Sequence, residues 1–268
     1  MKIPSGAPPL LVFADLDGTL LDSAFSAAKS EACVRHAMRR GVPVVLCSAK
    51  TLAEVRPIRT ELGLEGVPCI GENGSVVFWP DGTLGRLDVF GIPARDIRDR
   101  LDRIVQRAGI QLTGYGSLEP EQVAAITGLS PASARLAMSR EYSETLVDAY
   151  PASVWQNLEP EFRREGLVCW PGGRFHTVTG SGADKGRAVR WVTNQYERSG
   201  GRALTTVGVG DSANDLPMLG AVVRAYLVQR PGGIWEEMSL PRLHRVPAVG
   251  PIGFSQVMGS ELAGLGRD

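Results

Sequence analysis

Apolar residues occur in short uninterrupted runs, and amphipathic stretches separate these runs along much of the chain. Leu10 to Phe13 and Val42 to Cys47 are two such runs, and Thr205 to Gly210 is expected to be a further strand. A short, almost wholly apolar run is typical of a strand that is covered on both faces in a parallel sheet. The pattern therefore predicts an α/β fold in which helices alternate with the strands of a Rossmann-like parallel sheet.

The expected helices have recognisable ends. A first helix is predicted over Ser23 to Arg40, because its apolar residues form a rough stripe and Gly41 is a typical stop. Thr51 is expected to cap a second helix that runs to Leu62, with Glu54 completing a capping box. The other expected elements are a helix opened by Lys185, strands at Ser75 to Trp79, Val222 to Val228 and Arg245 to Val249, and a closing helix at Ser255 to Leu265.

The pattern changes in the middle of the chain, where short strands mix with helices instead of alternating regularly. A strand over Arg174 to Val178 is expected to lead the chain back to the first sheet. We therefore predict an inserted α+β cap domain at residues 83–173 and a core domain formed by residues 8–82 and 174–268. The elements expected in the insertion are helices at Arg95 to Arg107, Glu119 to Thr127 and Pro131 to Arg140, and strands at Thr145 to Val147 and Leu167 to Trp170.

Composition narrows the range of partners and compartments. Lys and Arg together number 29, as do Asp and Glu, so the formal net charge is zero and no nucleic-acid partner is expected. The four cysteines form no CxxC pair, which argues against a structural zinc site. They could form two disulfides, but the strand-like surroundings of Cys47 and Cys69 favour free buried thiols. The amino terminus has no long apolar segment, so we expect a cytoplasmic protein with no membrane partner.

The first expected strand ends in two carboxylates that are two residues apart, Asp15 and Asp17, and Gly18 then favours a sharp turn. Ligands of α/β sheets bind at the carboxyl ends of the strands. Two like charges at such a place are costly unless a cation or proton transfer explains them. One carboxylate can be a nucleophile and the other a general acid and base, and Mg²⁺ takes oxygen ligands of this kind. Alternatively, both residues belong to an ordinary turn.

Other polar residues follow expected strands or begin expected helices. Ser48 stands just before a helix, where a hydroxyl and backbone N–H groups favour a phosphate, although a simple capping role is the alternative. Lys50 could reach the same phosphate or be solvated. Lys185 lies in the first turn of an expected helix, where the helix dipole disfavours a positive charge. A lysine is tolerated at such a place on the surface, but a lysine that binds phosphate is also expected there. Asp211 and Asp215 follow another strand and would complete an oxygen-rich cation site.

Four of these segments, in this order, resemble the motifs of the haloacid dehalogenase-like phosphatases. Asp15 to Leu20 is similar to the first motif, Ser48 and Lys185 to the next two, and Gly210 to Asp215 to the last. Glu72-Asn73-Gly74, which by itself favours a tight turn, resembles the subgroup with a large cap that includes sugar-phosphate enzymes. The resemblance implies a haloacid dehalogenase-like core with an inserted cap.

Further segments narrow the resemblance to the mannosyl-3-phosphoglycerate phosphatases. They are Gly114 to Ser117, Arg140 to Thr145 and Gly172 to His176, together with Ser48 to Thr51. Ser143 departs from that family, in which we expect an acid at this place. The resemblance implies hydrolysis of a small phosphorylated sugar-glycerate, a glycosyl-3-phosphoglycerate, to the glycosylglycerate, which is a compatible solute. It does not say whether the sugar is mannose or glucose.

The resemblance also implies catalytic roles. Asp15 would be the nucleophile that forms an aspartyl-phosphate, and Asp17 would be the general acid and base. Ser48 and Lys185 would stabilise the phosphoryl oxygens, where most of the transition-state charge lies. Mg²⁺ is the implied cofactor, and its ligands would be the side chains of Asp15 and Asp211, the backbone carbonyl of Asp17 and, through water, Asp215.

Residues that would bind the substrate are expected in the cap and near Ser48. Arginine suits a carboxylate, because its planar fork can hold both oxygens. The candidates are Arg140 and Arg174 for the carboxylate, Glu141, Tyr142 and Asn73 for sugar hydroxyls, and Lys50 for the phosphate. Three alternatives stay open: a broader sugar-phosphate phosphatase, a phosphomutase, and a sugar-phosphate binding protein without activity. The oligomeric state is not predicted.

Overall fold

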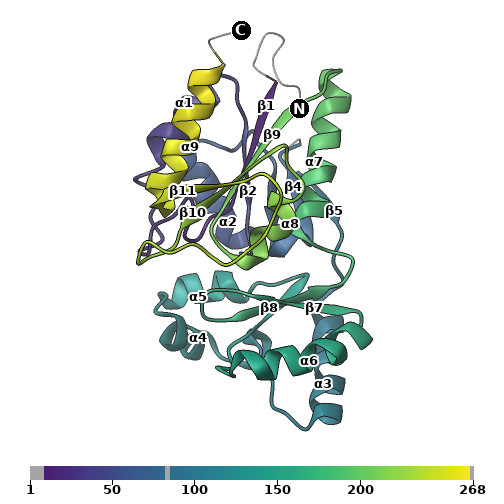
Figure 1. Ribbon diagram of the computed structural model, residues 1–268. Helices are drawn as coiled ribbons and strands as arrows, with labels where there is room; N and C mark the ends of the chain where they lie inside the picture. The colour runs from purple at the N-terminus through teal and green to yellow at the C-terminus, as the bar shows by residue number, and fades with distance from the viewer. Residues whose placement is uncertain (1–8, 82–84, 266–268) are drawn as a thin grey trace.

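The larger of two sheets forms the centre of the protein in the computed structural model, which describes residues 9–81 and 85–265 (Figure 1). Its eight strands lie in the order β11 (Leu243–Val249), β10 (Arg224–Gln229), β9 (Thr205–Gly210), β1 (Leu10–Ala14), β2 (Val44–Cys47), β3 (Cys69–Gly71), β4 (Val76–Trp79) and β5 (Arg86–Val89). Neighbours from β11 to β3 run parallel, while β4 and β5 add an antiparallel edge. The order confirms the predicted α/β fold.

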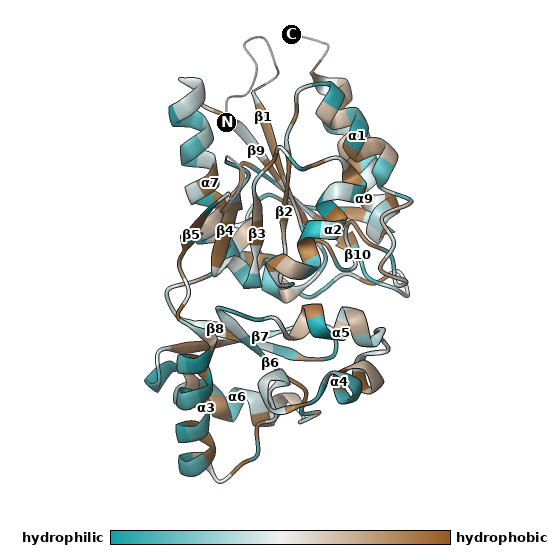
Figure 2. Ribbon diagram, turned by 180° about the vertical axis from the view of Figure 1, so that it is seen from behind, coloured by the Kyte–Doolittle hydropathy of each residue, from teal (hydrophilic) through white to brown (hydrophobic). Residues whose placement is uncertain are grey.

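Helices cover both faces of this sheet (Figure 1). One face carries α1 (Glu31–Arg39), α2 (Leu52–Leu62) and α9 (Gly250–Gly264), and the other carries α7 (Lys185–Gly200) and α8 (Leu216–Leu219). All five residues of β1 are buried, and the strands are the most apolar part of Figure 2. None of the described helices is long and apolar enough to cross a membrane.

The smaller sheet lies beyond the carboxyl ends of the parallel strands (Figures 1 and 2). Its antiparallel strands are β6 (Ser143–Leu146), β8 (His176–Gly180) and β7 (Leu167–Pro171), in that order. Two helices, α3 (Ala94–Ala108) and α6 (Ala152–Arg164), pack on the side away from the larger sheet, where they bury a separate apolar cluster. The remaining helices are α4 (Pro120–Thr127) and α5 (Pro131–Met138), and the short 3₁₀ turns are η1 (Glu72–Gly74), η2 (Tyr115–Ser117) and η3 (Ala213–Asp215).

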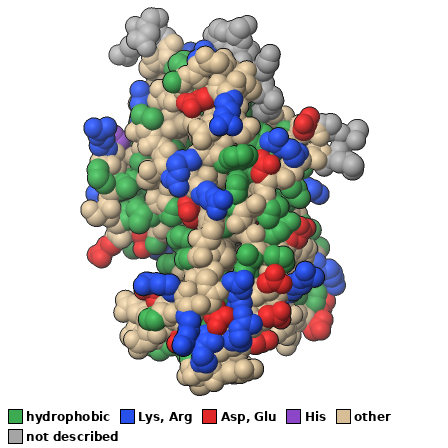
Figure 3. All heavy atoms as spheres, turned by 90° about the vertical axis from the view of Figure 1, so that its right-hand side faces the viewer, with side chains coloured by type: hydrophobic (Ala, Val, Ile, Leu, Met, Phe, Trp, Pro, Cys, Tyr) green, Lys and Arg blue, Asp and Glu red, His purple; other side chains and the backbone are tan. Residues whose placement is uncertain are grey.

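Ion pairs join the two helices of this outer layer. Arg103 Nη2 lies 2.8 Å from Glu165 Oε2, and Arg107 contacts both Glu161 and Glu165 at 2.8 and 2.7 Å. Positive and negative side chains are accordingly intermixed on the lower part of the face in Figure 3. Each exposed ion pair of this kind contributes little to stability. Together, the pairs mix positive and negative charge on the surface formed by α3 and α6.

The strand predicted over Arg174 to Val178 was expected to return to the first sheet, and this prediction was wrong. His176 to Val178 belong to β8, which is the central strand of the smaller sheet, and Arg174 and Phe175 precede it. The strand pairs with β6 and β7 on its two sides and four of its five residues are buried, so its burial resembles that of a strand in the larger sheet. Since β5 belongs to the larger sheet and β8 to the smaller, we propose cap boundaries near residues 90 and 181 instead of 83 and 173.

The first predicted helix is also partly wrong, because α1 begins only at Glu31. The preceding residues form a turn in which Asp22 Oδ1 accepts the N–H groups of Ala24 and Ser26 at 3.0 and 3.1 Å. Side chains of this kind compete with helical hydrogen bonds. Two elements, β5 and α6, were not predicted, and α9 begins five residues before the predicted closing helix. The capping box of α2 is confirmed.

Candidate active site

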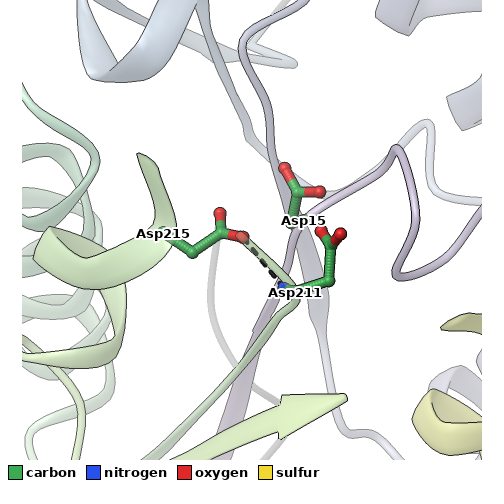
Figure 4. Close-up of side chains that lie close together, drawn as sticks. All are labelled: Asp15, Asp211 and Asp215. Atoms are coloured by element: carbon green, nitrogen blue, oxygen red, sulfur yellow. Dashed lines mark hydrogen bonds between the residues drawn. The ribbon is translucent and has the colours of Figure 1, made fainter. Parts of the chain in front are cut away.

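Three carboxylates meet at the carboxyl ends of two central strands (Figure 4). Asp15 follows β1, and Asp211 and Asp215 follow β9, which pairs with β1 in parallel. One oxygen of each carboxylate lies within 4.8 Å of the other two, and all three residues are buried. Gly18 must be glycine here, because a Cβ atom would lie 2.6 Å from Asp211 Oδ2 and the φ angle is +79°.

A single buried lysine enters this cluster. Lys185 Nζ donates to Asp15 Oδ1 at 2.7 Å and to Asp215 Oδ1 at 2.6 Å. The start of α7 can approach so closely because it packs against Gly74, where a Cβ atom would lie 2.2 Å from the carbonyl oxygen of Asp184. The lysine therefore neutralises one carboxylate charge and fixes one oxygen of Asp15, which leaves the other oxygen of Asp15 free of this bond.

The cluster retains excess negative charge in spite of Lys185. Burial and repulsion from Asp215 raise the pKa of Asp15 well above its usual value. The same two causes raise the pKa of Asp211 to about 7. Burial lowers the pKa of Lys185, but its ion pairs with Asp15 and Asp215 outweigh burial and raise it. Three buried carboxylates with one cation form a donor set that suits a hard divalent ion.

Each of the two later carboxylates has a different set of contacts. Asp215 Oδ2 accepts the backbone N–H groups of Asp211 and Ser212 at 3.0 and 3.2 Å, so it holds the loop after β9 in place. Among the described residues, the carboxylate of Asp211 has only long contacts, from Thr19 Oγ1 at 3.4 Å and Arg230 Nε at 3.9 Å. Asp211 is therefore the carboxylate that is most available to a cation.

Asp17 lies outside the group of three carboxylates, and its side chain is 45% exposed. Its Oδ2 atom forms an ion pair with Lys50 Nζ at 3.0 Å, and the same ammonium lies 3.7 Å from Glu54. Burial lowers the pKa of Lys50, but Asp17 and Glu54 together raise it above its usual value. Lys50 is thus a cation held beside Asp17, rather than the solvated side chain that was one alternative.

Ser48 is buried at the end of β2. Its Oγ atom accepts the backbone N–H of Lys50 at 3.1 Å, whereas the cap of α2 is Thr51, which accepts the N–H of Glu54. The simple capping role for Ser48 is therefore wrong. The backbone carbonyl of Ser48 also accepts the N–H of Asn73 at 3.0 Å, which joins the turn at η1 to the same strand end.

Asn73 lies beside the loop that carries the last two carboxylates. Its φ angle of 55° is in the left-handed region, which asparagine tolerates better than most residues. Its Oδ1 atom accepts from Asn214 Nδ2 at 3.3 Å, and its own Nδ2 atom is buried without a partner among the described residues. An unpaired buried donor is costly, so a ligand oxygen would be a natural partner for Nδ2.

The cap meets the core through Glu72, which the sequence indicates only as part of the Glu72-Asn73-Gly74 turn. Its buried carboxylate accepts the N–H groups of Glu141 and Tyr142 at 3.1 and 2.9 Å and the hydroxyl of Ser143 at 2.5 Å. Ser143 Oγ also accepts from Arg140 Nη1 at 2.9 Å. An acid at position 143 would face the Glu72 carboxylate, which explains why a serine stands there in this chain.

The predicted substrate-binding residues of the cap fall into two groups. Glu141 and Tyr142 contribute backbone groups to Glu72, and the side chain of Glu141 is exposed. Arg140 and Arg174 instead flank two aromatic rings that meet edge to face. The guanidinium of Arg140 lies 5.8 Å from the ring of Tyr115, that ring lies 6.2 Å from the ring of Phe175, and Arg174 lies 5.3 Å from Phe175. Arg174 also donates to the carbonyl of Ile126 at 2.8 Å.

Arg140 reaches from the cap to the core. Its Nη1 atom donates to the carbonyl of Ala49 at 3.2 Å, next to Lys50, and its buried Nε atom has no partner among the described residues. The hydroxyl of Thr51 donates to the carbonyl of Leu136 at 2.8 Å across the same junction. The structure therefore brings Arg140 close to Lys50, which itself pairs with Asp17, whereas Arg174 contacts Phe175 and Ile126 of the cap.

The contacts of Glu72 predict its effect on stability. Glu72→Ala would leave two backbone N–H groups without their acceptor, so we expect the free energy of unfolding to fall by about 2–4 kcal/mol. Urea denaturation checks this, with Glu65→Ala as the control, because Glu65 is exposed in the same part of the chain. A loss no larger than that of the control would contradict the anchoring role of Glu72.

Comparison with known proteins agrees with this arrangement. A family model described as haloacid dehalogenase-like hydrolase matches residues 12–114. A glucosyl-3-phosphoglycerate/mannosyl-3-phosphoglycerate phosphatase from Persephonella marina is 33% identical over 259 residues, which cover 92% of this chain and 95% of the relative. A protein of the same name from Methanococcoides burtonii is 33% identical over 262 residues, with the same two coverages of 92% and 95%. The solved structure of a phosphatase of the haloalkanoate enzyme superfamily from Bacteroides thetaiotaomicron covers 98% of both chains, with a TM-score of 0.68 and 18% identity.

Proposed function

Since this chain belongs to the haloacid dehalogenase-like phosphatases, and is thus a phosphoric monoester hydrolase, we propose that it removes phosphate from mannosyl-3-phosphoglycerate and glucosyl-3-phosphoglycerate. Relatives that carry this activity in their names match the chain over nearly its whole length, cap included. The observation that carries the proposal is the position of two cations beside the first motif: Lys50 pairs with Asp17, and Arg140 contacts Ala49, the residue before Lys50. This substrate brings a carboxylate close to its phosphate, so such cations would suit it. We predict, as before, a cytoplasmic enzyme.

The donor set fits Mg²⁺. Asp15 and Asp211 would hold the ion by their side chains, with the backbone carbonyl of Asp17 and, through water, Asp215. When bound, the ion would neutralise the excess charge of the cluster and polarise the phosphoryl oxygens. The raised pKa values of Asp15 and Asp211 support this, because they show that the protein alone does not balance the charge.

The chemistry follows from the two carboxylates of the first motif. Lys185 holds one oxygen of Asp15, and the other oxygen attacks phosphorus as the bond from phosphorus to the glycerate oxygen breaks. Asp17 enters this step protonated, released from its ion pair with Lys50, and gives that proton to the leaving oxygen. Water then attacks the aspartyl-phosphate, Asp17 takes the proton of this water, and Asp15 is released with inorganic phosphate. Ser48 and Lys185 would hold the phosphoryl oxygens, and the unpaired Nδ2 atom of Asn73 would join them in place of the sugar contact first expected for it.

The glycerate and the sugar would lie between the core and the cap. Lys50 and Arg140 provide positive charge for the carboxylate, and the buried Nε atom of Arg140 is a donor still without a partner among the described residues. Arg174 stands further out and would contact the sugar side of the leaving group. Glu141 and Tyr142 are placed at the junction of core and cap, so their part in binding hydroxyls would require the cap to move.

The test is phosphate release from both glycosyl-3-phosphoglycerates, from 3-phosphoglycerate and from glucose 6-phosphate, with and without Mg²⁺. We expect Mg²⁺-dependent release and the highest kcat/KM on a glycosyl-3-phosphoglycerate. Comparable rates on glucose 6-phosphate would favour a broad sugar-phosphate phosphatase. Transfer of phosphate between sugar positions without its release would favour a phosphomutase.

The raised pKa of Asp211 predicts how cation binding depends on pH. Protons hold Asp211 neutral below its pKa of about 7, and a cation must displace them, so affinity should rise as pH rises toward 7 and then level off. Calorimetric titration with Mg²⁺ in two buffers of different ionisation enthalpy measures the protons released. We expect release at about pH 6 that declines by about pH 8. Binding that does not change over this range would contradict the assignment of Asp211.

A further inference from the structure

The turn between β1 and α1 carries an exposed aromatic residue. Phe25 is 51% exposed, and its φ angle of 58° lies in the left-handed region, which bulky residues rarely adopt. The surrounding turn enforces this conformation, because Asp22 accepts the N–H groups of Ala24, Phe25 and Ser26. Backbone strain that the surrounding structure maintains in this way is common at functional sites.

The ring of Phe25 lies next to the cation that pairs with Asp17. Lys50 Nζ is 4.9 Å from the centroid of the ring and 3.0 Å from Asp17 Oδ2. The cation–π contact orients the ring, while about half of the side chain stays exposed. Phe25 is therefore an apolar surface at the rim of an otherwise charged site.

The reaction places the leaving group at this rim. Asp17 must touch the oxygen that joins phosphorus to the glycerate in order to protonate it. The rest of the leaving group then extends past Asp17, where Lys50 and Arg140 attract its carboxylate. The part that remains is a pyranose, which has an apolar C–H face and a rim of hydroxyl groups. Only an apolar or aromatic surface complements the C–H face, and Phe25 offers such a surface here.

We propose that Phe25 is a specificity-determining residue, whose ring stacks against the sugar of the substrate. The inference rests on the proposed function, because its ligand is the sugar of a glycosyl-3-phosphoglycerate. The sugar is remote from the reacting atoms, so its contact forms equally in the bound substrate and in the transition state. Removing it should therefore raise KM and leave kcat little changed.

The experiment compares kcat/KM on glucosyl-3-phosphoglycerate with kcat/KM on 3-phosphoglycerate, which has the same phosphate and carboxylate but no sugar. Phe25→Ala should lower the first value about tenfold or more and leave the second unchanged. Phe25→Gly should show the same selective loss without loss of thermal stability, because glycine adopts the left-handed conformation freely. Phe25→Tyr retains the ring and should retain the ratio. Val223→Ala is the control, since Val223 is 62% exposed and directly precedes β10. It therefore lies at the amino end of a parallel strand, whereas the site lies at the carboxyl ends.

The three variants of Phe25 distinguish a contact with the sugar from a role in holding Lys50. Selective loss in Phe25→Ala and Phe25→Gly, with the ratio kept in Phe25→Tyr, supports the sugar contact. Parallel loss on both substrates would overturn it, because the ring would then serve only to hold Lys50. An unchanged ratio would overturn it as well. If the wild-type enzyme does not prefer the glycosyl substrate, the proposed substrate is wrong, whereas a preference that survives in Phe25→Ala contradicts only the role of Phe25.

Discussion

Asp15→Asn is expected to reduce phosphate release by at least about 10⁴-fold, because an amide cannot form the aspartyl-phosphate. Rapid acid quench with radiolabelled substrate should trap a phosphoenzyme in the wild type and none in the variant. A trapped phosphoenzyme in Asp15→Asn would assign the nucleophile to another residue.

The variant should fold normally, which separates chemistry from stability. A buried acid whose pKa is raised destabilises the fold when it ionises, and the pKa of Asp15 is raised by burial and by Asp215. The uncharged amide removes this cost at neutral pH, although it weakens the ion pair with Lys185. We therefore expect a thermal midpoint equal to that of the wild type or above it. A clearly lower midpoint would show that the ion pair outweighs the repulsion.

Asp17→Asn should lower kcat by about 10²–10⁴-fold, because an amide neither protonates the leaving oxygen nor accepts a proton from water. The metal site should survive, since the side chain of Asp17 points to Lys50 and lies outside the cluster of three carboxylates. Phosphate release measures the first expectation, and Mn²⁺ binding followed by electron paramagnetic resonance measures the second.

Asp81→Asn is the matched control for this variant, because Asp81 is an exposed acid that follows β4. It should match the wild type in turnover and in metal binding. Near-normal turnover in Asp17→Asn would remove Asp17 from the role of acid and base. Loss of Mn²⁺ together with turnover would instead make its side chain a metal ligand.

The meeting of the candidate site residues could be predicted from the sequence because its determinants are local. Asp15, Ser48 and Asp211 each follow a short apolar run, and the carboxyl ends of parallel strands meet at one edge of a sheet. Lys185 could be placed there because a lysine at the start of a helix contradicts the dipole preference unless an anion is near. The structure adds that this anion includes Asp15 and Asp215 themselves.

The junction of core and cap could not be predicted in the same way. Glu72 binds backbone groups about seventy residues away, and neither hydropathy nor spacing indicates such a partner. Phe25 lay within a predicted helix, and only the hydrogen bonds of Asp22 show that the chain turns there. The strand β8 was assigned to the wrong sheet because it follows the insertion and is buried as fully as a strand of the larger sheet.

The most direct test is a crystal structure of the protein with Mg²⁺ and trifluoroberyllate, which imitates a phosphoryl group on a carboxylate. The account predicts beryllium bonded to an oxygen of Asp15, with one Mg²⁺ ion held by Asp15 and Asp211. Beryllium on another residue, or an ion that does not contact both of these carboxylates, would contradict it.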